Sequence, residues 1–224
     1  MENNLFYPVL SRHELDAYYN RDGKFYADYK SNYELVSSDC LKRCVYCDAT
    51  ERECGGDHFS LDHFRPRKIF GDKFDGLLII HPYNLYLSCQ KCNILKSSDW
   101  HGCSQSIDGY TFSNKKGFLD RFDNDFLTHI TVNNQGEIVS LNESGPVNYM
   151  IKKLHLNRPN RVYIRYLRLI NEKTANICRI IDIINSKISF KYDNGELSAE
   201  KAMALLQKIQ DLQYSFHQIQ KRIK

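Results

Sequence analysis

Cys44-Val-Tyr-Cys47 and Cys89-Gln-Lys-Cys92 decide how the middle of this chain folds, because each is a C-x2-C pair. Together they offer four thiolates, the complete tetrahedral set of a structural zinc ion. Such a closed set leaves no coordination position for a substrate, so its role would be to stabilise a loop-rich segment too small to be held together by burial alone. We therefore expect Zn²⁺ at these four cysteines, the alternative being that they are free buried thiols.

The other cysteines, Cys40, Cys54, Cys103 and Cys178, have no partner at this spacing. An isolated cysteine more often packs as a small apolar side chain than it serves as a ligand. We therefore leave these four outside the zinc site. Replacement of one of the four ligands by Cys40 or Cys54 is the main alternative arrangement.

The bulk composition is typical of a folded chain. Its 224 residues are 42% hydrophobic and suffice for one good-sized domain or two small ones. A net charge of +4 gives only weak support for an acidic partner such as nucleic acid. The first residues, MENNLF, do not form an apolar export signal, and no stretch approaches the roughly 18 apolar residues that span a bilayer. We expect a cytoplasmic protein in a reducing compartment, which favours zinc over disulfides.

The segment between and after the cysteine pairs should form a strand, a second strand and a helix. Residues 59–64 alternate in a way that predicts a strand with Asp62 and His63 on opposite faces. Residues 77–80 form a second apolar run, and residues 89–96 can begin a short helix.

The segment before the cysteines should be a helical scaffold. Ser11 followed by Glu14 makes a capping box, and the positions from Leu15 to Tyr26 predict an N-terminal helix. We assign residues 1–39 to this scaffold and residues 40–128 to the zinc-stapled core.

Residues 129–224 should contain a hairpin and two long helices, which makes the fold class α+β. Asn134-Gln-Gly136 supplies the turn between two β-rich arms. Pro159 can sit in the first turn of the first helix, and Asp193-Asn-Gly195 separates the two. Each helix carries a heptad seam, the residues being Tyr163, Leu167, Ile170, Thr174, Ile177, Ile181, Ile184 and Ile188, then Ala202, Leu205, Ile209, Leu212, Phe216, Ile219 and Ile223. The helices should pack as an antiparallel hairpin or form an intermolecular interface.

Asp62, His63 and Asn93 are the candidate catalytic residues, because the cysteine cluster would bring them towards one place. Hydrolysis of a phosphodiester needs a base that activates water and a divalent cation that neutralises developing charge. The carboxylate of Asp62 and the amide oxygen of Asn93 are hard ligands suited to Mg²⁺ or Mn²⁺. A neutral imidazole at His63 can accept a proton near neutral pH.

These residues resemble the ββα-metal core of HNH endonucleases in residue type, order and spacing. The resemblance rests on Asp62-His63, Asn84-Leu85 and Cys89-x2-Cys92-Asn93-x2-Lys96. It implies that His63 is the general base, that Asp62 and Asn93 bind the catalytic metal, and that Asn84 fixes the loop. The third signature position holds Asn93 rather than a histidine, a variant that keeps an oxygen ligand.

The wider pattern is similar to PtuB-type HNH subunits of Septu and retron-linked bacterial antiphage systems. The similarity rests on the run from Leu87 to Asn93 and on Leu154-His-Leu-Asn-Arg-Pro159. It implies that the chain is the nuclease effector of a defence complex. It also implies an ATPase partner subunit, PtuA-like, for which the two C-terminal helices would be a suitable docking region.

Basic residues concentrate where a scissile phosphate would lie. They are Arg65, Arg67, Lys68, Lys91 and Lys96. Such contacts position a nucleic acid without reading its sequence, and the alternative is a solvated basic turn. Arg161, Arg165 and Arg168 share one helical face and either extend this track or face solvent.

DNA is the expected target. RNA is an alternative, because the same metal chemistry cuts either backbone and no base-reading motif is visible. A different class of function is a zinc-stapled module that binds nucleic acid or protein and has lost catalysis. His58, His81 and His101 lie near the motif without an assigned role.

Overall fold

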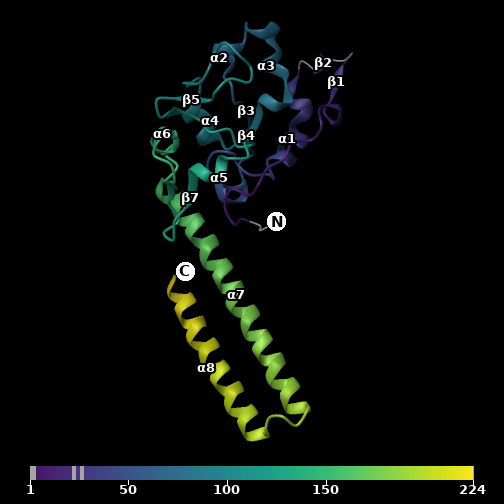
Figure 1. Ribbon diagram of the computed structural model, residues 1–224, viewed down its shortest axis with the longest axis vertical. Coiled ribbons are helices and arrows are strands. Elements are labelled where there is room, and N and C mark those ends of the chain that lie inside the picture. Colours follow the sequence, from purple (N-terminus) through teal and green to yellow (C-terminus); the bar gives the residue numbers. More distant parts are fainter. Residues whose placement is uncertain (1–3, 22–23, 26–27, 224) are drawn as a thin grey trace. The chain divides into compact units, whose positions relative to one another are not determined.

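The computed structural model describes residues 4–21, 24–25 and 28–223 (Figure 1). The chain forms two units, Met1–Arg168 and Leu169–Lys224, and each is described by itself. Helix α7, Pro159–Asp193, runs through the boundary between the units.

The first unit combines short helices with two-stranded antiparallel sheets, as the predicted α+β class requires. Its helices before α7 are α1 Tyr33–Asp39, α2 Arg67–Phe70, α3 Leu77–Ile80, α4 Gln90–Lys96, α5 Phe126–His129 and α6 Val147–Lys153. Its strands are β1 Asn20–Arg21, β2 Lys24–Phe25, β3 Ser60–His63, β4 Leu85–Ser88, β5 Phe112–Ser113, β6 Lys116–Gly117, β7 Ile130–Val132 and β8 Ile138–Ser140. Turns of 3-10 helix lie at Leu15–Ala17, Tyr29–Asn32, Arg52–Cys54, Phe74–Gly76 and Pro82–Asn84.

The hairpin β3–β4 and the helix α4 position the candidate site. Ser60 pairs with Ser88, and His63 pairs with Leu85, in an antiparallel register. Cys89 is the N-cap residue of α4, so the chain passes from strand directly into helix. This register places the start of α4 beside the start of β3, and Lys96 at the end of α4 reaches Asp62 and the carbonyl of His63.

The predicted strand at residues 77–80 is wrong, because these residues form the helix α3. Gly76, with a φ of +73°, precedes α3, and the extended backbone of His81 ends it. A short apolar run does not distinguish a strand from a helical turn by its periodicity. The partner of β3 is therefore β4, which directly precedes Cys89.

The predicted N-terminal helix is also wrong over its described residues. The turn Leu15–Ala17 is a single 3-10 turn, and the chain continues into β1. Tertiary contacts override local helix propensity here. The hydroxyl of Tyr18, for example, donates to the carboxylate of Asp39. Tyr26, the predicted end of this helix, lies outside the described residues.

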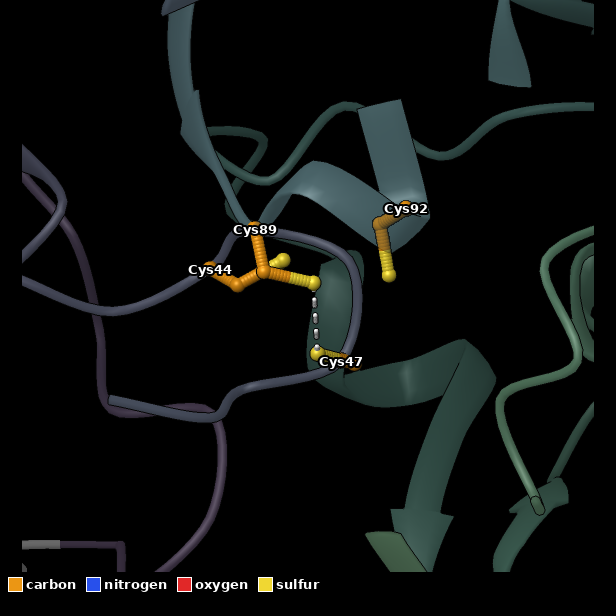
Figure 2. A group of neighbouring side chains, drawn as sticks. All are labelled: Cys44, Cys47, Cys89 and Cys92. Carbon is orange, nitrogen blue, oxygen red and sulfur yellow. Dashed lines mark hydrogen bonds between the residues drawn. The ribbon is translucent and has the colours of Figure 1, made fainter. Parts of the chain in front are cut away.

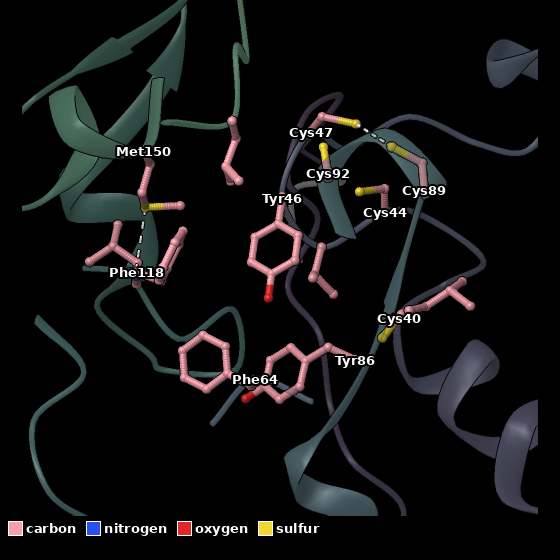
Figure 3. Close-up of a cluster of buried hydrophobic side chains, with 14 of the residues drawn as sticks. Cys40, Cys44, Tyr46, Cys47, Phe64, Tyr86, Cys89, Cys92, Phe118 and Met150 are labelled. Atoms are coloured by element: carbon pink, nitrogen blue, oxygen red, sulfur yellow. Dashed lines mark hydrogen bonds between the residues drawn. The ribbon is translucent and has the colours of Figure 1, made fainter. Parts of the chain in front are cut away.

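One cluster of buried side chains joins the elements of the first unit (Figure 3). Phe118 and Met150 lie in it together with the rings of Tyr46 and Tyr86, and the cysteine pairs belong to the same cluster. The hairpin β7–β8, which the sequence predicted, contributes Ile130 and Ile138 to it. The cysteine cluster and β3 of the candidate site therefore pack directly against the main hydrophobic core.

The second unit is a pair of helices, the C-terminal part of α7 and α8, Ala199–Ile223 (Figure 1). The predicted start of α7 at Pro159 and its end at Asp193 are confirmed. Ile188, Ala202 and Ile209 are buried where the helices pack. Part of the chain thus forms the intramolecular hairpin that the sequence predicted.

The rest of the heptad pattern packs less closely than predicted. Leu212 is 67% exposed and Ile184 is 41% exposed, although both were assigned to a seam. Ile219 and Ile223 lie outside the side chains that the structure describes. Within the described residues, none of the helices combines the length and the apolarity that crossing a membrane requires.

Candidate active site and metal centre

The four cysteines of the C-x2-C pairs meet in one buried cluster (Figure 2). Their sulfur atoms all lie within 4.8 Å of one another, and Sγ of Cys47 is 3.8 Å from Sγ of Cys89. A tetrahedron with zinc–sulfur bonds of about 2.3 Å has edges of about 3.8 Å. The four buried thiols could therefore bind a metal such as zinc.

Two short segments bring these thiols together. The loop that holds Cys44 and Cys47 is attached to β4, because the backbone N–H of Val45 donates to the carbonyl of Leu87 at 3.0 Å. The second pair begins at the N-cap of α4, and Cys92 lies within that helix. A bound metal would thus connect the loop, the strand and the helix.

Among the described residues, the other cysteines stay outside this metal-binding group. Cys40 is buried in the core, and desolvation raises the pKa of its thiol to about 11. The sulfur of Cys54 accepts a hydrogen bond from the guanidinium of Arg161 at 2.7 Å. Neither replaces one of the four clustered thiols.

Asp62 is a buried carboxylate with two side-chain partners. The hydroxyl of Tyr46 donates to Oδ2 of Asp62 at 2.5 Å, and the ammonium of Lys96 lies 3.0 Å from the same oxygen. Lys96 is fully buried and also donates to the carbonyl of His63 at 2.9 Å. The negative charge of Asp62 is therefore balanced by a cation from α4.

His63 is held in one ring orientation at the end of β3. Its Nε2 lies 2.8 Å from the carbonyl oxygen of Ile79, which requires a proton on Nε2. In the neutral ring, Nδ1 is then the free acceptor. Burial lowers the pKa of His63, while the carbonyl of Ile79 opposes this shift. The neutral imidazole is therefore the form favoured near pH 7.

A cavity of about 290 Å³ collects the predicted catalytic residues. Its lining residues are Leu61, Asp62, His63, Pro66, Arg67, Lys68, Asn93, Ser97 and Ser98. Among the described residues, the side chain of Asn93 has no hydrogen-bond partner, so its amide oxygen is available to a ligand. The structure thus places a carboxylate, an imidazole and an amide around one space, with two basic side chains beside them.

Asn84 is placed as a loop organiser. Its Nδ2 donates to the carbonyls of Arg65 and Leu78 at 3.1 and 2.7 Å, and its Oδ1 accepts from the backbone N–H of Arg65 at 2.8 Å. Asn84 is buried and does not line the cavity beside His63. Its role is therefore to hold the segment that follows β3.

The predicted phosphate contacts are corrected at two positions. Lys96 is fully buried against Asp62 and has no surface to offer a phosphate. Arg65 is 8% exposed and donates to the carbonyl of Gly109, away from the cavity beside His63. Arg67 and Lys68 line that cavity. Lys91 is exposed on α4, and its contact with phosphate stays a prediction.

Neither alternative for the arginines of α7, a basic track or solvent-facing side chains, is found. Arg165 is 2% exposed and donates to the carbonyl of Gly136 at 2.7 Å. Arg168 forms ion pairs with Asp48 and Glu53. These side chains, with Arg161, attach the first turns of α7 to the rest of the first unit instead of extending a basic surface.

The three unassigned histidines do not line the cavity of His63. His81 accepts a hydrogen bond from the backbone N–H of Tyr83, and His101 contacts the hydroxyl of Tyr149. The side chain of His58 is 93% exposed beside Glu51. These contacts give no reason to place them in the candidate site.

Sequence reasoning missed two groups that orient the site, the Tyr46 hydroxyl and the Ile79 carbonyl. Tyr46 lies between the cysteines of the first pair, so its position next to the cluster was visible, but its contact with Asp62 was not. A backbone carbonyl carries no signal in the sequence. Comparison of the chain with models of protein families, with curated proteins and with solved structures finds no match in any of the three.

Proposed function

We propose that this chain is a metal-dependent HNH-type endonuclease that hydrolyses phosphodiester bonds of DNA. The observation that carries the proposal is the cavity of about 290 Å³ that Asp62, His63 and Asn93 line together. They come from the β3–β4 hairpin and from α4, which follows it directly. This order of two strands and a helix, beside a cysteine cluster, is what the resemblance to HNH nucleases implies.

His63 is proposed as the general base. The carbonyl of Ile79 fixes its ring and leaves Nδ1 to accept a proton from water. Because burial lowers its pKa, the imidazole is neutral and competent near pH 7. Asn84 supports this geometry by holding the backbone just after His63.

Asp62 and Asn93 are proposed as ligands of Mg²⁺ or Mn²⁺. Carboxylate and amide oxygens are the donors that such hard cations prefer, and the Asn93 amide has no competing partner among the described residues. When bound, the ion would neutralise charge that develops on the phosphate and on the leaving oxygen. Arg67 and Lys68 would hold the neighbouring phosphates.

Zn²⁺ is proposed as the metal of Cys44, Cys47, Cys89 and Cys92. The cluster is closed, buried and made only of sulfur, which is the donor set of a structural zinc site. This zinc would hold the scaffold and take no part in the hydrolysis.

Plasmid cleavage tests the proposal. The protein should nick or cut DNA with Mg²⁺ or Mn²⁺ and lose this activity in EDTA, and side-by-side digestion of DNA and RNA identifies the target. His63→Ala should abolish cutting while its metal content and circular dichroism match the parent. His58→Ala is the matched control, because His58 is exposed and does not line the cavity. Undiminished cutting by His63→Ala contradicts the role of His63.

A second candidate function is a binding module without catalysis, and one observation favours it. The ammonium of Lys96 already balances Asp62, whose carboxylate is 5% exposed. Such a pair competes with a divalent cation for the same oxygen. Binding of nucleic acid that is unaffected by EDTA, with no cutting under any divalent ion, would support this module and exclude the nuclease.

The C-terminal helices are proposed to dock the ATPase partner of a bacterial antiphage complex. In the second unit, apolar side chains such as Ile180 and Phe190 are 56% and 65% exposed. Exposed apolar groups on a helix pair are suited to packing against another protein. Co-purification from the native host, followed by mass measurement of the complex, tests this partner.

A further inference from the structure

A second cavity, of about 610 Å³, lies in the first unit and shares no lining residue with the cavity of His63. Buried Phe64 and Tyr86 belong to its lining, and so do the exposed side chains of Tyr110 and Ile107. A large cavity with an apolar lining and a few polar groups is the usual form of a ligand site. None of the predicted catalytic or zinc residues accounts for it, apart from the loop organiser Asn84, which also lines it.

The lining of this second cavity suits a flat ring. Phe64 and Tyr86 stack on each other with their ring centroids 4.6 Å apart, and the guanidinium of Arg12 lies 4.7 Å from the Tyr86 centroid, so these buried rings form the base of the cavity. Tyr110 is 63% exposed, and Ile107 is 39% exposed. An exposed aromatic side chain such as Tyr110 can hold a planar base by stacking. Single exposed apolar side chains are common on protein surfaces, but several grouped at one cavity indicate a binding site.

Two carboxylates add hydrogen-bond acceptors to this lining. Oδ1 of Asp120 accepts from the Tyr86 hydroxyl at 2.6 Å and from the Phe122 N–H at 2.9 Å. Among the described residues, the carboxylate of Asp123 has no hydrogen-bond or salt-bridge partner. Partial burial, together with Asp120 and Asp125, raises the pKa of Asp123 to about 6. Asp123 is exposed at the cavity, so its carboxylate is open to a hydrogen bond from a bound group.

Arg65 adds a donor that lacks an acceptor. It lines the cavity, is 8% exposed, and donates from Nη2 to the carbonyl of Gly109 at 2.8 Å. Its Nη1 is buried and has no hydrogen-bond partner. A buried group of this kind calls for a partner that the chain itself does not supply. A ligand that accepts from Arg65 would satisfy this donor, and the same ligand can donate to the exposed carboxylate of Asp123.

We propose that this cavity binds a guanine base, stacked on Tyr110, with Asp123 accepting from the base and Arg65 donating to it. Guanine carries one acceptor, O6, beside two adjacent donors, N1–H and the 2-amino group. The two donors match the two oxygens of a carboxylate. A phosphate is a poor occupant, because Asp108, Asp120 and Asp123 line the same cavity and repel an anion.

The other bases fit this lining less well. Uracil and thymine offer a single donor between two acceptors, and cytosine offers one amino group beside two acceptors. Adenine lacks an oxygen acceptor beside its amino group. Hypoxanthine keeps O6 and N1–H but lacks the 2-amino group, so it isolates one contact to the carboxylate. Enzymes that take a base out of the stack read it through such an edge together with stacking.

As a statement about substrate, this inference rests on the proposed nuclease function and names guanine-containing strands as its target. The test of base binding does not depend on cutting. The full-length protein is titrated calorimetrically with GMP, IMP, AMP, CMP and UMP. GMP should bind about tenfold or more tightly than IMP and the other nucleotides, because each competitor leaves a charged or buried group without its partner.

Variants locate the base. Asp123→Asn should weaken GMP binding about tenfold, because an amide cannot accept from both donors of the base. Asp125→Asn is the matched control: it removes the same charge two residues away, at a side chain that is 68% exposed and does not line the cavity. Tyr110→Ala should weaken GMP and IMP alike by removing stacking. No saturable GMP binding, equal binding of GMP and IMP, or equal effects of the two aspartate variants would overturn the proposal.

Two further measurements distinguish guanine in a nucleic-acid strand from a free guanine nucleotide, and base binding from nuclease activity. A short single-stranded DNA with one guanine is compared with the same strand carrying hypoxanthine. Preference for guanine in the strand supports recognition within nucleic acid, whereas preference only among free nucleotides supports a nucleotide ligand and overturns the statement about substrate. His63→Ala should bind GMP as the parent does. If GMP binds but no nucleic acid is ever cut, the nuclease proposal fails and the base site stands.

Discussion

Lys96 and Asp62 form a buried ion pair directly behind the candidate catalytic histidine. The Lys96 ammonium lies 3.0 Å from Oδ2 of Asp62 and donates to the carbonyl of His63. Taking two charges out of water is costly, and their attraction offsets this cost only while both partners are present. The pair therefore joins α4 to β3 at the point where the proposed site needs a fixed geometry.

Lys96→Met should destabilise the first unit by about 3 kcal/mol, because it leaves the carboxylate of Asp62 buried without its cation. Urea denaturation followed by tryptophan fluorescence measures the change. Lys91→Met on the same helix is the control, since Lys91 is exposed and its replacement should change stability by less than about 0.5 kcal/mol. Equal effects of the two variants would show that the pair contributes nothing to stability.

Lys91 and Lys96 show which properties of single residues the sequence could predict and which it could not. The spacing of Cys44, Cys47, Cys89 and Cys92 expresses local coordination chemistry, so the cluster was predictable. The charge of a lysine is also visible, but its burial depends on which segments fold over it. Lys96 was therefore placed on the surface, although it is fully buried.

At the scale of secondary-structure elements, a metal bound by the cysteine cluster should hold the Cys44–Cys47 loop, β4 and α4 together. If the cluster holds the proposed zinc, Cys92→Ser should bind it more weakly and lose much of the folded structure of the first unit, because three thiols bind zinc more weakly than four and binding contributes directly to folding. Zinc per chain by mass spectrometry and circular dichroism measure both effects. Cys40→Ser should keep about one zinc per chain, because Cys40 is equally buried but lies outside the cluster.

The turn of the β7–β8 hairpin packs directly on α7. A Cβ added at Gly136 would lie 2.4 Å from the carbonyl oxygen of Val162 and 2.7 Å from the backbone nitrogen of Tyr166. Both contacts are to the helix backbone, which cannot move aside as a flexible side chain can. Gly136 also has a φ of +83°, which side-chain-bearing residues rarely adopt.

Gly136→Ala should therefore destabilise the first unit by about 3 kcal/mol, the sum of backbone strain and a steric clash. Gly56→Ala is the control, because Gly56 has a φ of +88° but no atom within 4 Å of the added Cβ. It should cost only the strain, about 1 kcal/mol. Thermal unfolding of the two variants measures the difference, and similar losses would mean that the turn does not pack tightly on α7.

Helix ends with strong local signals were predictable, and helices without them were not. Helix α7 begins at Pro159 and ends before Asn194-Gly195, as predicted. Proline and glycine set these ends because they act through the backbone of their own segment. The predicted N-terminal helix failed, because its residues make long-range contacts such as that of Tyr18 with Asp39. The same holds for α3, where a four-residue apolar run carried no signal to separate helix from strand.

On the scale of the whole molecule, the described residues include two hydrophobic clusters, one in each unit. The larger one contains the cysteines and lies within residues 7–156. The smaller one contains Ile188, Ala202 and Ile209 in the helix pair. Because the clusters share no residue, damage to the smaller one should leave the cysteine cluster and the candidate catalytic cavity intact.

A pair of α8 variants tests this independence in the full-length chain. Ile209→Asp should destabilise the helix pair by about 2 kcal/mol or more, because Ile209 is 8% exposed and the new carboxylate would be buried without a partner. Leu212→Asp, one turn further along, should have little effect, since Leu212 is 67% exposed despite its place in the predicted seam. Thermal unfolding followed at 222 nm measures the helix pair, and zinc per chain reports on the first unit. Loss of zinc in Ile209→Asp would mean that the two units unfold together. Equal destabilisation by both substitutions would mean that Leu212 packs in the helix seam, as its heptad position predicted.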